Sequence, residues 1–146
     1  FNFVYANARR WSIDASRMAI GGFSAGGYGS AYAVFALGAP ASALICFSSG
    51  MGPEDADACI PALNRDVPVL VFQGENDLPD VLGGTEALST RAARAGLRMR
   101  RYQVPGKGHF YDRPSRIVTM ASTFPGAEDC HTVGEAVDRF ISETIG

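Results

Sequence analysis

The sequence has little of several features that mark specialised classes of protein. Three cysteines and two histidines among 146 residues are too few, at their spacing, for the Cys/His sets that hold structural zinc. No apolar run approaches the length that a helix needs to cross a bilayer. The 13 basic and 15 acidic residues are mixed along the chain, without a basic stripe that could contact phosphates. We therefore expect no metal, no membrane span and no nucleic-acid partner.

What is present is an ordinary globular composition, with 47% hydrophobic and 19% charged residues. The length predicts one compact domain over residues 1–146. The first residue is Phe1 rather than Met, which is typical of an internal start and leaves the compartment open. Cys46 lies in an apolar run and is expected to be a buried thiol, whereas Cys59 and Cys130 lie in polar segments and could form a disulfide.

Apolar runs alternate with segments of helical period along the chain. Strands are predicted at residues 18–23, 43–47, 67–72 and 97–104, the first buried on both faces and the last near the sheet edge. Helices are predicted at 2–11, at 25–37, at 85–95 with Thr85 as N-cap, and after a capping box at Thr132. Residues 50–66 and 105–131 are expected to be irregular, with a short helix at 115–123. The five arginines between residues 91 and 101 are interpreted as a solvated helix face that runs into an edge strand. This alternation predicts an α/β fold, a parallel sheet with helices on both faces.

One pentapeptide carries a chemical signal. Gly22-Phe23-Ser24-Ala25-Gly26 has the Gly-x-Ser-x-Gly form of a nucleophile elbow, between an expected strand and an expected helix. Such a turn is tight, and we expect it to hold Ser24 in a strained conformation, with glycines where side chains would strike the strand and helix. The helix N-terminus would direct its partial positive charge toward a developing oxyanion, with the backbone N–H of Ala25 as donor.

A serine nucleophile needs a base, and the base needs an orienting acid. His109 lies in the loop after an expected strand, whereas His131 precedes the last helix, so His109 is the preferred base. Asp77 follows the third expected strand and is the preferred acid, with Asp80 and Glu75 as rivals. The order Ser24, Asp77, His109 is the serine–acid–histidine order of α/β-hydrolases.

The segments 20–27, 69–77 and 108–110 resemble the α/β-hydrolase superfamily. The stretch from Pro105 to Tyr111 is similar to the dienelactone hydrolase group, and residues 12–17 are similar to polyester depolymerases and feruloyl esterases. The dienelactone hydrolase group typically uses a cysteine nucleophile, so Ser24 favours general ester hydrolysis. The resemblance implies a serine esterase that acts on small-molecule or polymeric esters without a cofactor. Phe110 and Tyr111 are expected to contact substrate, whereas Phe23 and Tyr28 are assigned mainly to the core.

The resemblance also implies a departure from the family pattern. Such enzymes carry further strands before the nucleophile strand, and a loop among them supplies a second oxyanion N–H. We expect this chain to be N-terminally truncated relative to them, which would leave an exposed sheet edge and favour a homodimer. Two rivals stay open: a serine peptidase of the prolyl oligopeptidase type, and a catalytically incomplete fragment or pseudo-enzyme that acts as a binding domain.

Overall fold

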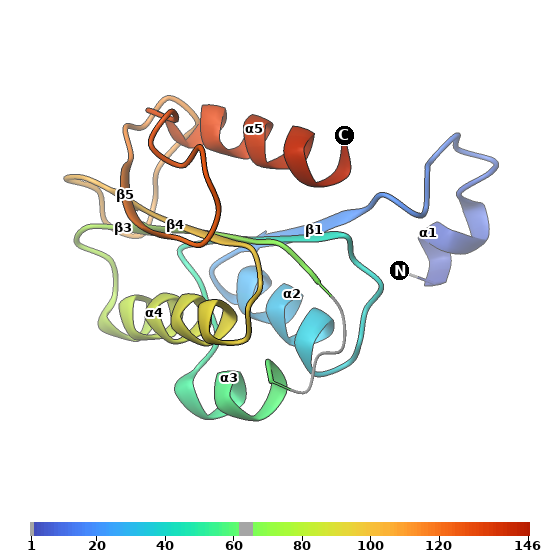
Figure 1. Ribbon diagram of the computed structural model, residues 1–146, viewed down its shortest axis with the longest axis horizontal. Coiled ribbons are helices and arrows are strands. Elements are labelled where there is room, and N and C mark those ends of the chain that lie inside the picture. The colour runs from blue at the N-terminus through green and yellow to red at the C-terminus, as the bar shows by residue number, and fades with distance from the viewer. Residues whose placement is uncertain (1, 62–65) are drawn as a thin grey trace.

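A five-stranded sheet forms the middle layer of the molecule (Figure 1). The computed structural model describes residues 2–61 and 66–146. The strands follow one another across the sheet in chain order: β1 (Ala19–Phe23), β2 (Ala43–Phe47), β3 (Val69–Gly74), β4 (Met99–Val104) and β5 (Val118–Ser122). The first four strands are parallel, as predicted, and β5 pairs antiparallel with β4.

Strand β5 corrects the short helix that was expected at 115–123. The run Ile117-Val118-Thr119 is β-branched, which suits an extended backbone. Pairing with β4 settles the conformation, because Gln103 and Tyr102 supply partners for Val118 and Thr119 across the ladder. This pairing also corrects the expected position of β4, which is flanked by strands on both sides.

Helices cover both faces of the sheet, as the fold class requires. The helices α2 (Ala25–Phe35), α3 (Pro53–Cys59) and α4 (Pro79–Arg94) lie on one side, and α5 (Val133–Ile145) lies on the other (Figure 1). The short helix α1 (Asn2–Asn7) extends away from the body of the fold. It is shorter than the helix expected over residues 2–11.

Two helices begin where the sequence pattern placed loops. Helix α3 occupies part of the segment expected to be irregular, and Pro53 stands in its first turn, where a missing N–H costs nothing. Helix α4 likewise starts at Pro79, six residues before the expected cap at Thr85. Thr85 is buried inside the helix and its hydroxyl donates to Gln73 Oε1 at 2.7 Å. The capping box of α5 is confirmed, since Thr132 Oγ1 accepts from Glu135 N–H.

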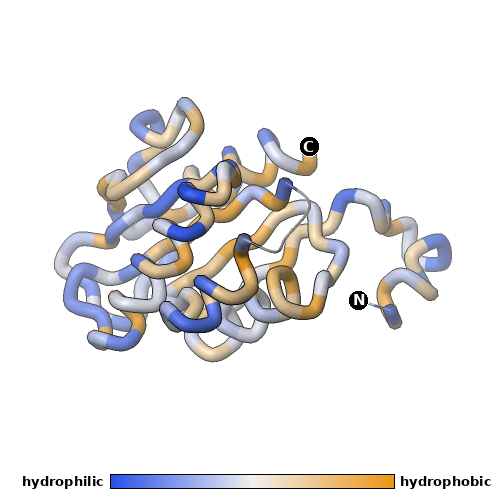
Figure 2. Tube along the Cα trace, turned by 60° about the horizontal axis from the view of Figure 1, so that its bottom comes forward, coloured by the Kyte–Doolittle hydropathy of each residue, from blue (hydrophilic) through white to orange (hydrophobic). Residues whose placement is uncertain are grey.

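The core divides into two apolar clusters, one on each side of the sheet, and the hydropathic colouring of Figure 2 shows apolar residues along the central segments. Strands β2 and β3 are buried on both faces. Strand β1 is not: its residues alternate between exposed and half-buried, because it is the edge strand of the described sheet. The expected double burial of this strand is therefore wrong.

The disulfide between Cys59 and Cys130, which the sequence left open, does not form, because all three cysteines are free. Cys59 packs against the cluster under α2, α3 and α4, whereas Cys130 belongs to the cluster under α5. The sheet separates the two thiols. Cys46 is fully buried in β2, as expected, and burial raises the pKa of its thiol to about 12.

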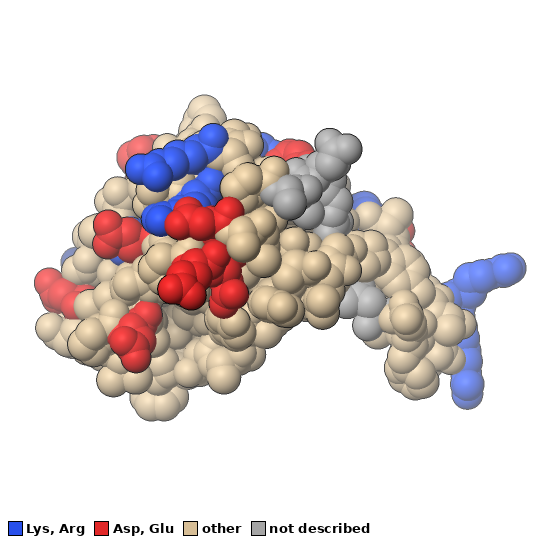
Figure 3. Space-filling model, turned by 90° about the horizontal axis from the view of Figure 1, so that it is seen from below, with Lys and Arg blue, Asp and Glu red and all other residues tan. Residues whose placement is uncertain are grey.

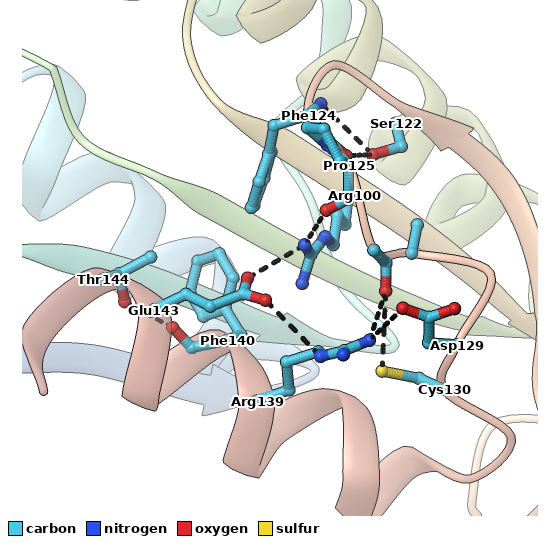
Figure 4. A network of polar contacts seen from close by, with 12 residues as sticks. Arg100, Ser122, Phe124, Pro125, Asp129, Cys130, Arg139, Phe140, Glu143 and Thr144 are labelled. Carbon is cyan, nitrogen blue, oxygen red and sulfur yellow. Dashed lines mark hydrogen bonds and ion pairs between the residues drawn. The ribbon is translucent and has the colours of Figure 1, made fainter.

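The arginine run is only partly a solvated face. Arg91 forms an ion pair with Asp57 on the helical side, and Figure 3 shows acidic and basic side chains close together on that face. Arg100, by contrast, points into the other side of the sheet and is fully buried. It pairs with Glu143 at 2.8 Å, contacts the carbonyl of Pro125 and lies 4.0 Å from the centre of the Phe124 ring (Figure 4). Strand β4 is thereby tied to helix α5.

Candidate active site

The turn between β1 and α2 has the strained backbone that the pentapeptide predicts. Ser24 has φ 54° and ψ −126°, a conformation that non-glycine residues rarely adopt. The Ser24 N–H donates to the Phe47 carbonyl at 2.9 Å, and the Ser24 carbonyl accepts from Gly27 N–H at 2.9 Å. These bonds hold the serine between the end of a strand and the first turn of a helix.

The glycines around Ser24 are not equivalent. A Cβ on Gly22 would lie 2.3 Å from the backbone of Gly26, and one on Gly27 would lie 2.6 Å from Ser49 Cβ. A Cβ on Gly26 would meet nothing within 4 Å. The expectation that side chains at both flanking positions would clash is therefore right for Gly22 and wrong for Gly26, because Gly26 is on the outer side of the turn.

The structure brings the three predicted site residues together at the carboxyl ends of the strands. Ser24 Oγ lies 2.9 Å from His109 Nε2. His109 Nδ1 lies 2.7 Å from Asp77 Oδ1. With the proton on Nδ1, the imidazole donates to Asp77 and accepts from the serine hydroxyl, which is the arrangement a general base requires.

Asp77 is held as a carboxylate by its surroundings. Its side chain is fully buried, and Oδ1 and Oδ2 accept from the backbone N–H groups of Leu78 at 2.8 Å and Gly74 at 3.3 Å. Burial alone would raise the pKa of Asp77, but hydrogen bonds from Ser48, His109 and these two amides outweigh it and lower the pKa. The group thus stays ionised beside His109.

Among the described residues, the other candidates for the acid and the base are not hydrogen-bonded to the Ser24–His109–Asp77 set. The Glu75 carboxylate accepts from Gly106 N–H at 2.7 Å, so it holds the loop that leads to His109. Asp80 lies in the first turn of α4 and lines a cavity near Ser24. His131 is exposed, and its N–H donates to Glu135 in the capping region of α5.

A cavity of about 190 Å³ opens beside Ser24. Its walls come from the first turn of α2, the loop after β2 and the start of α4; among them are Ala25, Tyr28, Met51 and Val81. Tyr28 is thus a wall of this cavity rather than a core residue, and its hydroxyl donates to Asp55 at 2.8 Å. The loop 48–52 contributes five of the lining residues, and part of it lies in the segment 50–66 that was expected to be irregular.

Aromatic residues flank His109 on the other side. Phe110 is 75% exposed and stacks on Phe23, with ring centres 5.3 Å apart. Phe23 also meets the His109 ring edge-on at 5.0 Å, so it lies at the site surface and not in the core. Tyr111 differs from Phe110, because it turns inward and its hydroxyl accepts from Ser48 N–H at 2.8 Å. Of the two residues expected to contact substrate, Phe110 is the exposed one.

The backbone N–H of Ala25 stands at the start of α2 and donates to no acceptor within residues 2–61 and 66–146. It is the donor that the sequence assigns to an oxyanion. Within these same residues, no group of His, Cys, Asp and Glu side chains could hold a metal ion. No helix of the described chain is long and apolar enough to cross a membrane.

Sequence reasoning missed Ser48. This residue follows β2, is fully buried and has φ 44°. Its hydroxyl donates to the His109 carbonyl at 2.8 Å and helps to lower the pKa of the Asp77 carboxyl. A serine after a buried strand carries no local pattern that separates it from the many serines of loops, so only the packing of β2 beside β3 identifies it.

No family model matches the chain, and no curated protein sequence does so. Solved structures do match in shape. Esterase PE8 superposes with a TM-score of 0.65 at 21% identity, over 98% of this chain and 57% of that one. Esterase 2 of Thermogutta terrifontis, phosphorylated by paraoxon, gives 0.69 at 17% identity, over 97% and 59%. A puromycin-hydrolyzing peptidase of Mycobacterium tuberculosis gives 0.68 at 17% identity, over 99% and 25%.

The chain thus spans about three fifths of the length of these two esterases and a quarter of that peptidase. At such identities the likeness concerns the fold. The mostly parallel sheet, the helices on both of its faces and the superposition on esterases agree. Over the residues that superpose on these structures, the chain has the α/β-hydrolase fold.

Proposed function

We propose that the chain belongs to a serine hydrolase that cleaves carboxylic esters through a covalent acyl-enzyme. The observation that carries this proposal is the continuous set of hydrogen bonds from Ser24 through His109 to Asp77. Three residues far apart in sequence meet in the geometry that activates a serine, on a strained turn that has no other evident use. The esterase titles among the structural neighbours support the same reaction class.

The geometry supports a two-step reaction. His109 Nε2 takes the proton of Ser24 as Oγ attacks the ester carbonyl, and Asp77 stabilises the imidazolium that forms. The Ala25 N–H binds the oxyanion of the tetrahedral intermediate. The intermediate collapses, the alcohol leaves with the proton from His109, and an acyl group stays on Ser24. His109 then deprotonates water, which attacks the acyl carbonyl, and the carboxylic acid departs as Ser24 regains its proton.

The cavity beside Ser24 favours a small group on one side of the scissile bond. Its volume of about 190 Å³ is below the roughly 300–1,000 Å³ of pockets that enclose drug-sized ligands. The side of Ser24 that Phe23 and Phe110 line is open, and exposed aromatic rings there could contact an apolar or polymeric leaving group. Short-chain acyl esters are therefore the first substrates to test.

Covalent labelling is the sharpest test, since it needs one reaction per molecule rather than turnover. Turnover also depends on binding, deacylation and product release, whereas labelling reports directly whether Ser24 is an activated nucleophile. Incubation with paraoxon, followed by intact mass and peptide mapping, should give one diethylphosphoryl adduct on Ser24. Ser24→Ala should give none, and Ser122→Ala, at an exposed strand position, should label like the unchanged chain. An unlabelled chain, or an adduct elsewhere, would favour a binding domain instead.

Amide hydrolysis is the second candidate, because one structural neighbour is a puromycin-hydrolyzing peptidase. The same three residues would serve, since both reactions pass through an acyl-enzyme. Comparing a chromogenic ester with the matching amide distinguishes the two. A higher kcat/KM for the amide would assign the chain to the peptidases.

A further inference from the structure

Ser48 adopts a backbone conformation that needs an explanation. Its φ of 44° lies in the left-handed region, where glycine is the usual residue because a Cβ is unfavourable there. The residue is completely buried, directly after Phe47 at the end of β2. Glycine would fit this backbone with less strain. Retaining a serine indicates that its side chain does something that glycine could not do.

Two hydrogen bonds of Ser48 lead to the His109 loop, and a third, from its N–H to the Phe72 carbonyl at 2.9 Å, continues the pairing of β2 with β3. The Ser48 hydroxyl donates to the backbone carbonyl of His109 at 2.8 Å. The same hydroxyl also interacts with the Asp77 carboxylate and helps to lower its pKa. Its backbone N–H donates to the hydroxyl of Tyr111 at 2.8 Å. One residue directly after β2 therefore holds the loop after β4 and interacts with the acid after β3.

Tyr111 completes this arrangement from the loop side. Burial raises the pKa of its phenol to about 12, so the group stays neutral and does not repel the nearby Asp77 carboxylate. Because Tyr111 is two residues beyond His109, Ser48 hydrogen-bonds to the loop at two points, the His109 carbonyl and the Tyr111 hydroxyl. An imidazole on an exposed loop needs such an anchor to keep Nε2 facing Ser24.

We propose that Ser48 is a positioning residue for the triad, with Tyr111 as its partner, and that it fixes the His109 loop relative to Ser24 and Asp77. This inference rests on the proposed function for its catalytic consequence, although the hydrogen bonds themselves do not. It assigns Tyr111 to the support of the site, where the sequence had predicted contact with substrate.

Ser48→Gly separates positioning from a role in the fold, because glycine suits the backbone and removes only the hydroxymethyl group. Ser12→Gly is the matched control: Ser12 also has a positive φ, of 55°, but lies in an exposed turn. Both variants should unfold at a denaturant concentration close to that of the unchanged chain. Only Ser48→Gly should lower kcat for a short-chain ester, by about tenfold at unchanged KM, which corresponds to about 1.4 kcal/mol.

The pH dependence gives a readout that a purely structural role would not change. Without the Ser48 hydroxyl, the pKa of Asp77 rises and its carboxylate becomes a stronger acceptor from His109. It then stabilises the imidazolium more, so the acid limb of the kcat profile, where the base takes up a proton, should move to higher pH. Tyr111→Phe keeps the ring but removes the phenol oxygen that accepts from Ser48 N–H, while this N–H keeps the Phe72 carbonyl as its acceptor. It should lower kcat in the same direction, and it serves as the second variant if Ser48→Gly does not fold.

A measurement without turnover keeps this inference distinct from the proposed function. Titration of the Asp77 side-chain carboxyl by ¹³C NMR should show a higher pKa in Ser48→Gly and an unchanged one in Ser12→Gly. Equal Asp77 titration in Ser48→Gly and the unchanged chain, or equal kcat and acid limb, would overturn the role of Ser48. Failure of the proposed function would appear separately, as the absence of paraoxon labelling at Ser24.

Discussion

Replacing Asp77 by asparagine tests the central electrostatic argument, because it removes one charge and almost no volume. Both carboxylate oxygens accept from N–H groups: Oδ1 from Leu78 and His109, and Oδ2 from Gly74. An amide has only one acceptor oxygen. It should take the Oδ1 position, where two donors converge at 2.8 and 2.7 Å, and its NH₂ group then faces Gly74 N–H, so that only the weaker 3.3 Å hydrogen bond is lost. The Nδ1–H tautomer of His109 is then retained, and the loss is one of charge.

The magnitude follows from Coulomb's law. Opposite charges about 4 Å apart attract by about 4 kcal/mol at an effective dielectric constant of about 20. At about 1.4 kcal/mol per tenfold, the rate of paraoxon labelling or ester hydrolysis should fall by about a thousandfold. A reversed amide, which would force the wrong tautomer on His109, should cost about ten thousandfold. The two orientations can therefore be told apart by the size of the loss.

The assay is the pseudo-first-order rate of Ser24 phosphorylation, measured by mass spectrometry beside hydrolysis of a chromogenic short-chain ester. Asp138→Asn is the matched control, since that carboxylate is 68% exposed and pairs with Arg113 at the surface. A rate for Asp77→Asn within tenfold of the unchanged chain would refute the assignment. In that case Asp80→Asn and Glu75→Gln would show whether a rival carboxylate supplies the charge.

The same substitution predicts a pH dependence of stability. The pKa of Asp77 is lowered in the folded chain, so its ionised form contributes stability above the ordinary carboxyl pKa of about 4. That contribution is lost as the pH falls through the lower pKa of the folded state. The difference in unfolding free energy between the unchanged chain and Asp77→Asn should therefore narrow as the pH falls below about 4. A difference that is constant from pH 7 to pH 3 would contradict the assigned hydrogen bonds.

Three further predictions concern the elbow, the buried ion pair and the thiols. Gly22→Ala should lower the free energy of unfolding, measured by urea denaturation, by at least about 1–3 kcal/mol, because its Cβ would lie 2.3 Å from backbone atoms. Gly26→Ala should be neutral or should raise it by up to about 1 kcal/mol, because its Cβ would meet nothing within 4 Å. Equal effects would contradict the described turn. Glu143→Ala should cost about 3 kcal/mol, because it leaves a buried guanidinium of which two nitrogens have no partner among the described residues. Arg100→Met should cost less than about 1 kcal/mol. The reverse order by urea denaturation would refute this account. Cys59 should react with a thiol reagent in the native state, and the other two thiols only after unfolding; fewer than three reactive thiols in denaturant without reductant would indicate a disulfide.

Much of the site was predictable because its signals are local. The nucleophile elbow combines a strand, a tight turn and a helix within a few residues, and the structure gives Ser24 the expected strained φ. Asp77 and His109 each follow an apolar strand, and parallel strands bring their carboxyl ends to one edge of a sheet. The capping box at Thr132 is also a short-range pattern, and both of its hydrogen bonds are present in the structure. Burial of β2 and β3 could be predicted because their runs are uniformly apolar.

The remaining features depend on which segments meet across long sequence separations. Residues 118–122 form a strand because β4 offers a ladder, and Arg100 is buried because Glu143 on α5 reaches it. Cys59 and Cys130 stay apart because the sheet lies between their clusters. The sequence by itself determined the fold class and the residues that could carry the chemistry. Only the tertiary structure revealed that Ser48 joins Asp77 to the His109 loop, because that contact links residues on three neighbouring strand ends that no local pattern connects.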